Sequence, residues 1–202
     1  LTATASAGPV PGDTIYLEYK TSGPSRPIHY SYIYGERATS VNRPGGSFGY
    51  AGFLNWYGGI RTFCVQIKEG IQPDVVIPYT FAEVQNTPEG VSDPGPMGIM
   101  RETMIRDLYS RWWAPVNSST SFSTSSRDIC AAFQAMIWEI THETLDSTGT
   151  MDPGSVQVDA LALDFGAMQI NSMTSGATDF FYQMKMSLGG SNNDEWLNHL
   201  GD

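Results

Sequence analysis

The sequence predicts an α+β fold that begins with β-strands, continues with helices and ends with a mixed segment. Three observations carry this prediction. Residues 10–90 contain alternating segments rich in Tyr and Ile, residues 97–145 repeat apolar side chains at helical spacing, and residues 150–202 mix short patterns of both kinds. This order of elements along the chain is typical of α+β proteins. No linker interrupts the 202 residues, so we expect a single domain over residues 1–202.

The N-terminal strands are predicted from short alternating segments bounded by Gly, Pro and Ser. Residues 21–27, TSGPSRP, carry turn signals and are expected to separate the first two strands. Pro78 has no backbone N–H to donate, which predicts that its strand lies at a sheet edge or contains a bulge. Strands are expected at 13–20, 28–34, within 43–59, at 61–67 and at 75–84.

A first helix is predicted at about 97–113, in the segment MGIMRETMIRDLYSRWW. Its apolar side chains recur at steps of four residues, and charged side chains lie elsewhere on the helical wheel. Pro115 is expected to end this helix, because proline removes a backbone donor from a helix interior. The apolar positions are Met100, Met104, Leu108 and Trp112.

A second helix is predicted at about 127–145, with Ser125 or Ser126 as its N-cap. Its apolar face consists of Ile129, Phe133, Met136, Ile137 and Ile140, and its outer, solvent-facing side of Ala135, Glu139, His142 and Glu143. Between these two faces, Cys130, Gln134 and Trp138 form a stripe at steps of four residues. The amide of Gln134 is therefore expected beside the packed face, within reach of a strand docked against it.

The C-terminal part gives weaker patterns. Residues 159–173 have loosely helical spacing, and residues 178–188 alternate like a strand. A weak terminal segment, NDEWLNHLGD at residues 193–202, follows.

Composition and charge favour a secreted or cell-surface protein. The net charge of −10, without a basic stripe, excludes a nucleic-acid-binding role. No apolar run approaches the roughly 20 residues that span a bilayer. The small, polar start LTATASAGPVPG is as expected after removal of a signal peptide.

Motifs for metals, cofactors or turnover catalysis are missing from the sequence. His29, His142 and His199 lie on separate predicted elements, without the HxxxH or CxxC spacing of zinc sites. No Gly-x-Ser-x-Gly elbow or phosphate-binding loop occurs. We therefore expect no metal, no cofactor and no enzyme that turns over.

The two cysteines frame a choice between two bonds. Cys64 and Cys130 would form a disulfide if their Cα atoms lie within about 7 Å. Alternatively, the Cys64 thiolate would attack the side-chain carbonyl of Gln134, release ammonia and leave an internal thioester. Amides resist thiols in water, so this second reaction needs a fold that fixes sulfur and carbonyl carbon in attack geometry.

The motifs around these residues resemble those of bacterial thioester domains in cell-surface adhesins, particularly variants from secreted proteins with C-terminal sorting tails. Phe63-Cys64-Val65 is similar to the family's aromatic-Cys-aliphatic strand. Some seventy residues later, Phe133-Gln134-Ala135-Met136-Ile137-Trp138-Glu139 is similar to its Gln-containing helix. The resemblance covers roughly residues 45–145 and includes YAGFLNWYGG before the cysteine.

The resemblance implies a Cys64–Gln134 thioester in an antiparallel β-barrel or sandwich with a helical insertion. It further implies single-turnover covalent attachment to an amine or hydroxyl on a target protein, a polysaccharide or a neighbouring copy of the chain. Trp138, one turn from Gln134, is a candidate shield against water. His142 is a candidate general base for amine attack, although an outer-face histidine is more simply solvated. The alternative is a non-covalent, self-assembling surface protein with a Cys64–Cys130 disulfide.

Overall fold

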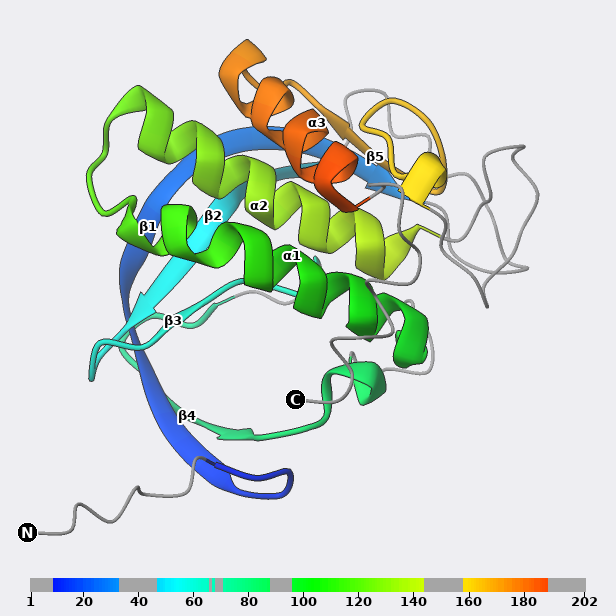
Figure 1. The fold of residues 1–202 in the computed structure, drawn as a ribbon. Coiled ribbons are helices and arrows are strands. Elements are labelled where there is room, and N and C mark those ends of the chain that lie inside the picture. Colours follow the sequence, from blue (N-terminus) through cyan, green and yellow to red (C-terminus); the bar gives the residue numbers. More distant parts are fainter. Residues whose placement is uncertain are drawn as a thin grey trace, which may run out of the picture.

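The computed structural model describes residues 9–32, 47–65, 67, 71–87, 96–143 and 158–188 (Figure 1). The polar start of the chain at 1–8, the weak terminal segment and His199 lie outside these residues. Within them the fold is α+β, as predicted, with five antiparallel strands and three α-helices.

The strands form one open antiparallel sheet. Its order is β3-β2-β1-β4, and β5 also pairs with β1. The described strands do not close into the barrel that the resemblance implies. Pro78 lies in β4, at one end of the strand order, as its missing N–H predicts. The strands are β1 (Thr14–Tyr32), β2 (Ser47–Trp56), β3 (Arg61–Thr62), β4 (Val76–Thr80) and β5 (Met168–Asn171).

Strand β1 is continuous where the sequence predicted two strands and a turn at 21–27. Its pairing with β2 shifts register between Tyr19 and Thr21 and again between Ser22 and Ser25, so the turn-forming residues produce bulges instead. Gly23 is required at this bend, because a Cβ there would collide with the ring of Phe53. The first part of β1 pairs with β4, and its last residues pair with β5.

Three helices lie side by side over one face of the curved sheet (Figure 1). The helices are α1 (Gly98–Ser118), α2 (Thr124–His142) and α3 (Ser175–Leu188), with short 3-10 turns η1 (Val84–Asn86) and η2 (Val158–Ala160). The central helix, α2, contacts β1, β2 and β5 as well as both other helices. Within the described ranges, none of the helices has the length and apolar character required to cross a membrane.

Helix α1 passes through Pro115 and ends at Ser118, so the prediction that Pro115 ends it was wrong. The hydroxyls of Ser118 and Ser119 both donate to the Pro115 carbonyl, at 2.9 Å each, and Val116 is fully buried. These contacts hold the last turn in place despite the lost backbone donor. The N-cap of α2 is Ser123, whose hydroxyl accepts the Ser126 N–H at 3.2 Å, and neither Ser125 nor Ser126 caps the helix.

The C-terminal predictions were also wrong. Residues 178–188 belong to α3, whose buried side chains are Ala177, Phe181, Met184 and Leu188. That spacing of four, three and four residues is helical, and the apparent alternation arose from exposed residues between them. Residues 159–173 contain the end of η2 and strand β5 but no α-helix.

The predicted outer face of α2 is buried. Ala135, Glu139, His142 and Glu143 are each at most 1% exposed. The reason is the cover supplied by α3 and β5, which contact α2 from a part of the chain that is distant in sequence. A helix enclosed by sheet and helices in this way has no solvent-facing side over most of its length.

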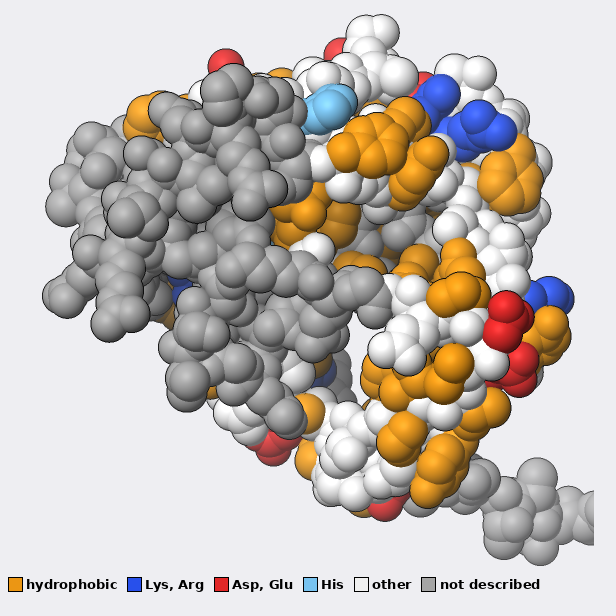
Figure 2. All heavy atoms as spheres, turned by 180° about the vertical axis from the view of Figure 1, so that it is seen from behind, with side chains coloured by type: hydrophobic (Ala, Val, Ile, Leu, Met, Phe, Trp, Pro, Cys, Tyr) orange, Lys and Arg blue, Asp and Glu red, His pale blue; other side chains and the backbone are white. Residues whose placement is uncertain are grey.

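The opposite side of the molecule carries exposed apolar side chains (Figure 2). Tyr16 on β1 and Phe48 and Tyr50 on β2 are each more than half exposed. The Phe48 ring contacts the rings of His29 and Tyr50, with centroids 5.5 and 5.4 Å away. Phe48 and Tyr50 lie on β2, which contacts α2.

Candidate functional site

Cys64 and Gln134 meet where the segment after β3 crosses α2. The Cys64 N–H donates to Gln134 Oε1 at 2.9 Å, and Gln134 Nε2 donates to the Cys64 carbonyl oxygen at 2.7 Å. Gln134 is 1% exposed, whereas Cys64 is partly exposed, so both bonds are partly buried. The primary amide is therefore held against the backbone of Cys64, the residue expected to act as its nucleophile.

Neighbouring residues fix the segment that carries Cys64. Arg61 Nη1 donates to both the backbone oxygen and Oδ1 of Asn117, at 2.7 and 2.8 Å, near the end of α1. The Phe63 ring packs against Phe133 of α2, with centroids 4.8 Å apart. The predicted strand at 61–67 is thus limited to Arg61–Thr62, and Cys64 lies just beyond it in an anchored, irregular segment.

The two hydrogen bonds fix the amide relative to the backbone of Cys64. Because Oε1 and Nε2 bond to the N–H and C=O of one residue, an edge of the amide faces that backbone. The Cys64 sulfur belongs to the residue that holds the amide, and attack on the planar carbonyl requires the sulfur to approach from above or below the amide plane.

The second cysteine, Cys130, is one turn before Gln134 on α2 and is fully buried. Burial raises the pKa of its thiol to about 12, and the charge of Arg61 lowers it only in part. The nucleophilic form of cysteine is the thiolate, so Cys130 is an unreactive thiol at neutral pH. No disulfide joins the two cysteines in this structure.

Trp138 and His142 continue along α2 from the amide. Trp138 is buried, and its ring centroid is 6.2 Å from that of Tyr30 on β1. His142 is buried as well, with Nδ1 3.0 Å from the Trp138 carbonyl oxygen, so the prediction of a solvated histidine was wrong. At 1.5 Å per residue, eight residues place His142 roughly 12 Å from Gln134 along the helix axis, too far for direct proton transfer.

Two buried carboxyl groups lie near the end of α2, where the sequence predicted a solvated pair of like charges. The Glu143 carboxylate accepts the backbone N–H of Ala167 at 2.9 Å and so ties α2 to β5. Gly166 is required beside it, since a Cβ there would collide with this carboxylate. Burial and the adjacent Glu143 raise the pKa of Glu139 well above its usual range, against smaller lowering effects from Ala162 and Lys185.

We expect the free energy of unfolding to fall as pH rises above about 4.5, the ordinary pKa of this carboxyl group. The folded protein keeps Glu139 protonated at a pH where the unfolded chain releases the proton. The contribution of Glu139 to the free energy of unfolding is therefore largest below the unfolded pKa and is lost as the pH rises through the folded pKa. The slope reaches up to about 1.4 kcal/mol per pH unit. Glu139→Gln should flatten it, as measured by urea unfolding between pH 5 and 9. Glu83→Gln, at an exposed site, is the control, and equal slopes for Glu139→Gln and the wild type would contradict the assignment.

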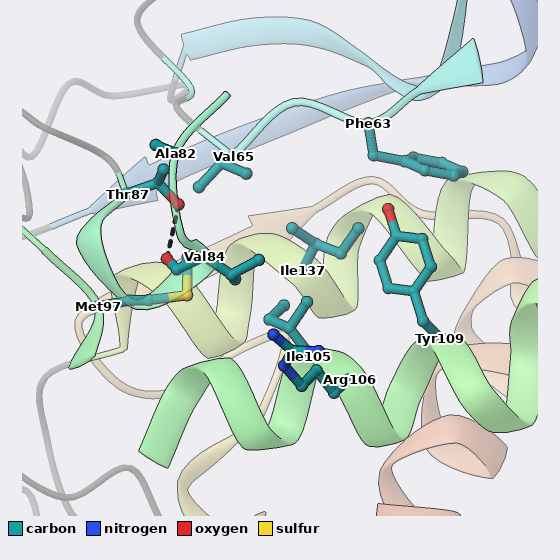
Figure 3. A pocket seen from close by; sticks show the side chains of 10 residues that line it. All are labelled: Phe63, Val65, Ala82, Val84, Thr87, Met97, Ile105, Arg106, Tyr109 and Ile137. Atoms are coloured by element: carbon teal, nitrogen blue, oxygen red, sulfur yellow. Dashed lines mark hydrogen bonds between the residues drawn. The ribbon is translucent and has the colours of Figure 1, made fainter. Parts of the chain in front are cut away.

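A pocket of about 330 Å³ is lined by chain neighbours of Cys64 and Gln134, but not by these two residues themselves (Figure 3). Phe63 and Val65, on either side of Cys64, form one wall, and Ile137, one turn after Gln134, forms another. Sequence reasoning missed this pocket, although the apolar residues flanking the cysteine were the signal for it. Its other lining residues are Ala82, Val84, Thr87, Met97, Ile105, Arg106 and Tyr109.

Comparisons of the chain with protein family models, with curated proteins and with solved structures find no match. A functional interpretation of Cys64 and Gln134 therefore depends on their own contacts and on the sequence motifs around them.

Proposed function

We propose that this chain is a covalent binding domain of a secreted or cell-surface protein, with an internal thioester between Cys64 Sγ and Gln134 Cδ. The observation that supports the proposal best is the pair of hydrogen bonds between the Gln134 amide and the Cys64 backbone. The motifs around both residues, which resemble those of bacterial thioester domains, point the same way.

Thioester formation follows from this arrangement in one addition and one elimination. The Cys64 sulfur attacks Gln134 Cδ, and the negative charge that develops on Oε1 faces the Cys64 N–H, 2.9 Å away, which acts as a preorganised oxyanion donor. The C–N bond then breaks, and the thiol proton leaves with the nitrogen as ammonia. A C–S bond has replaced a C–N bond, with no oxidant or cofactor.

Attachment to a target is the second half of the chemistry. A target amine or hydroxyl attacks Cδ, the C–S bond breaks, and the proton of the nucleophile returns to the Cys64 sulfur. Gln134 ends as an amide or ester linked to the target, and Cys64 ends as a free thiol. The chain acts once, so it is a covalent binder and not an enzyme.

Survival of the thioester until a target arrives requires that water be excluded. Phe133, next to Gln134, is fully buried, and Trp138, one turn further on, is 5% exposed. These rings provide apolar cover on the helix that carries the acyl carbon. His142 has no part in the proposed reaction, because of its distance along the helix.

Intact-mass measurement of freshly prepared protein tests the proposal. The wild type should be lighter than its sequence by one ammonia and should gain one methylamine on treatment, with appearance of a new thiol. Cys64→Ala should abolish both changes. Cys130→Ala is the matched control on the neighbouring cysteine and should retain both, because its thiol is buried and takes no part.

Two results would contradict the proposal. A wild-type mass equal to that calculated from the sequence, and unchanged by methylamine, would exclude the thioester. A loss of two hydrogens that reductant reverses would instead identify a Cys64–Cys130 disulfide and a non-covalent role.

A further inference from the structure

The pocket is lined by Phe63 and Val65, which flank Cys64, and by Ile137, one turn after Gln134. Adjacent Cα atoms are about 3.8 Å apart, so the walls formed by Phe63 and Val65 begin one residue from Cys64. Its exposed lining residues, Ala82 and Arg106, place part of the lining at the surface. A group bound here would therefore be held close to the reacting pair.

The pocket offers an apolar surface with few polar groups available to bind a ligand. The Thr87 hydroxyl donates to the Val84 carbonyl at 2.8 Å, as Figure 3 shows. The Arg106 guanidinium is neutralised by Glu102, with Nε 2.7 Å from Oε1. The hydroxyl of Tyr109 points toward the Phe63 side of the pocket, and burial raises its pKa to about 12, so it is neutral at physiological pH.

This lining suits an apolar side chain and not a sugar. Carbohydrate ligands present many hydroxyls, each of which loses its hydrogen bonds to water on burial unless the site replaces them. Here two of the three polar side chains already have partners within the protein. By contrast, an apolar cavity of about 150 Å³ is enough to hold benzene, so 330 Å³ accommodates an aromatic or branched aliphatic side chain.

We propose that this pocket selects the target, by binding an apolar side chain of a protein segment whose neighbouring lysine amine attacks Gln134 Cδ. The proposal rests on the thioester function and names its substrate class, a protein amine. The net charge of −10 agrees with it, because an acidic protein attracts cationic lysine-bearing segments and gives no such advantage to a neutral sugar. Binding energy from the apolar side chain would place the amine against the acyl carbon.

The rates of mass gain with two amines of similar basicity test this selection. 2-Phenylethylamine carries an apolar ring for the pocket, whereas ethanolamine carries a hydroxyl. We expect the wild type to add 2-phenylethylamine faster, on the order of tenfold or more. Ala82→Trp, which adds bulk to the pocket lining, should bring the two rates together. Val75→Trp introduces the same ring at an exposed position outside the lining and should leave the ratio unchanged.

The outcomes separate the pocket from the thioester. Equal rates for both amines in the wild type would overturn the pocket proposal and leave the thioester in place. Faster ester formation with methyl glucoside than amide formation with 2-phenylethylamine would overturn it in favour of a polysaccharide target. Absence of ammonia loss would overturn both proposals.

A binding measurement on Cys64→Ala, which cannot form the thioester, tests the pocket by itself. 2-Phenylethanol, which carries the ring without an amine, should shift the NMR methyl signals of Val65, Ile105 and Ile137. Unchanged signals at millimolar concentration would overturn the pocket proposal, whatever the wild type does with amines.

Discussion

A Gln134→Glu variant is expected to lose ammonia release and amine addition completely, and to unfold with about 3 kcal/mol less free energy than Cys64→Ala, which keeps the amide and cannot form the thioester. A carboxylate is not an electrophile for a thiol, which removes the reaction. The stability loss has a separate cause. A carboxylate oxygen would replace Nε2, which now donates to the Cys64 carbonyl at 2.7 Å, and would bring two acceptors together in a buried site.

Intact mass and urea unfolding measure the two effects independently. Gln72→Glu makes the same chemical change at an exposed position and should alter neither quantity beyond a few tenths of a kcal/mol. A Gln134→Glu protein that still took up methylamine would show that the acyl group comes from another residue. Equal stability of Gln134→Glu and Cys64→Ala would show that the amide is not held by the backbone of residue 64 in solution.

An Asp128→Ala variant is expected to lower the free energy of unfolding by about 2–4 kcal/mol. Asp128 of α2 is buried, and its Oδ1 accepts from Arg26 Nε of β1 and from the Thr174 hydroxyl, each at 2.7 Å. Its removal would leave a largely buried guanidinium without its carboxylate and would break a link between the sheet, α2 and the start of α3.

The matched comparison is Asp107→Ala, which removes another aspartate bonded to an arginine Nε. Asp107 accepts from Arg111 Nε at 2.8 Å, but this pair joins successive turns of α1, and Arg111 is partly exposed. A pair of this kind contributes less than about 1 kcal/mol. Chemical unfolding of both variants gives the comparison, and equal losses would contradict the role assigned to Asp128.

Local sequence patterns predicted the elements that depend on local interactions. Alternation, helical spacing and backbone chemistry predict the α+β class, the position of Pro78 at a sheet edge and the presence of two helices in the middle of the chain. The proximity of Cys64 and Gln134 was also foreseen, from the position of Gln134 on its helical wheel and from the resemblance. Their hydrogen-bonding pattern was not, because it depends on the irregular segment after Thr62.

Long-range packing accounts for most of what the sequence did not predict. Glu139 and Glu143 look like solvent-facing charges in the sequence, and their burial depends on elements that contact α2 from beyond residue 158. The continuity of β1 depends on the fit of Gly23 under Phe53, which no periodicity records. Pro115 remains helical because later residues satisfy its carbonyl.

The separation of Cys64 and Gln134 along the chain gives the proposed bond a mechanical meaning. The two residues are 70 positions apart, so a thioester would close a large covalent ring through β4, η1, α1 and the first part of α2. In the chain-entropy description of cross-links, a ring of that size restricts the unfolded chain enough to stabilise the fold by roughly 4 kcal/mol. Capture of a target opens the ring and returns this entropy to the chain. Attachment would therefore leave the domain easier to unfold under load than the unattached protein, at the moment when it first bears tension.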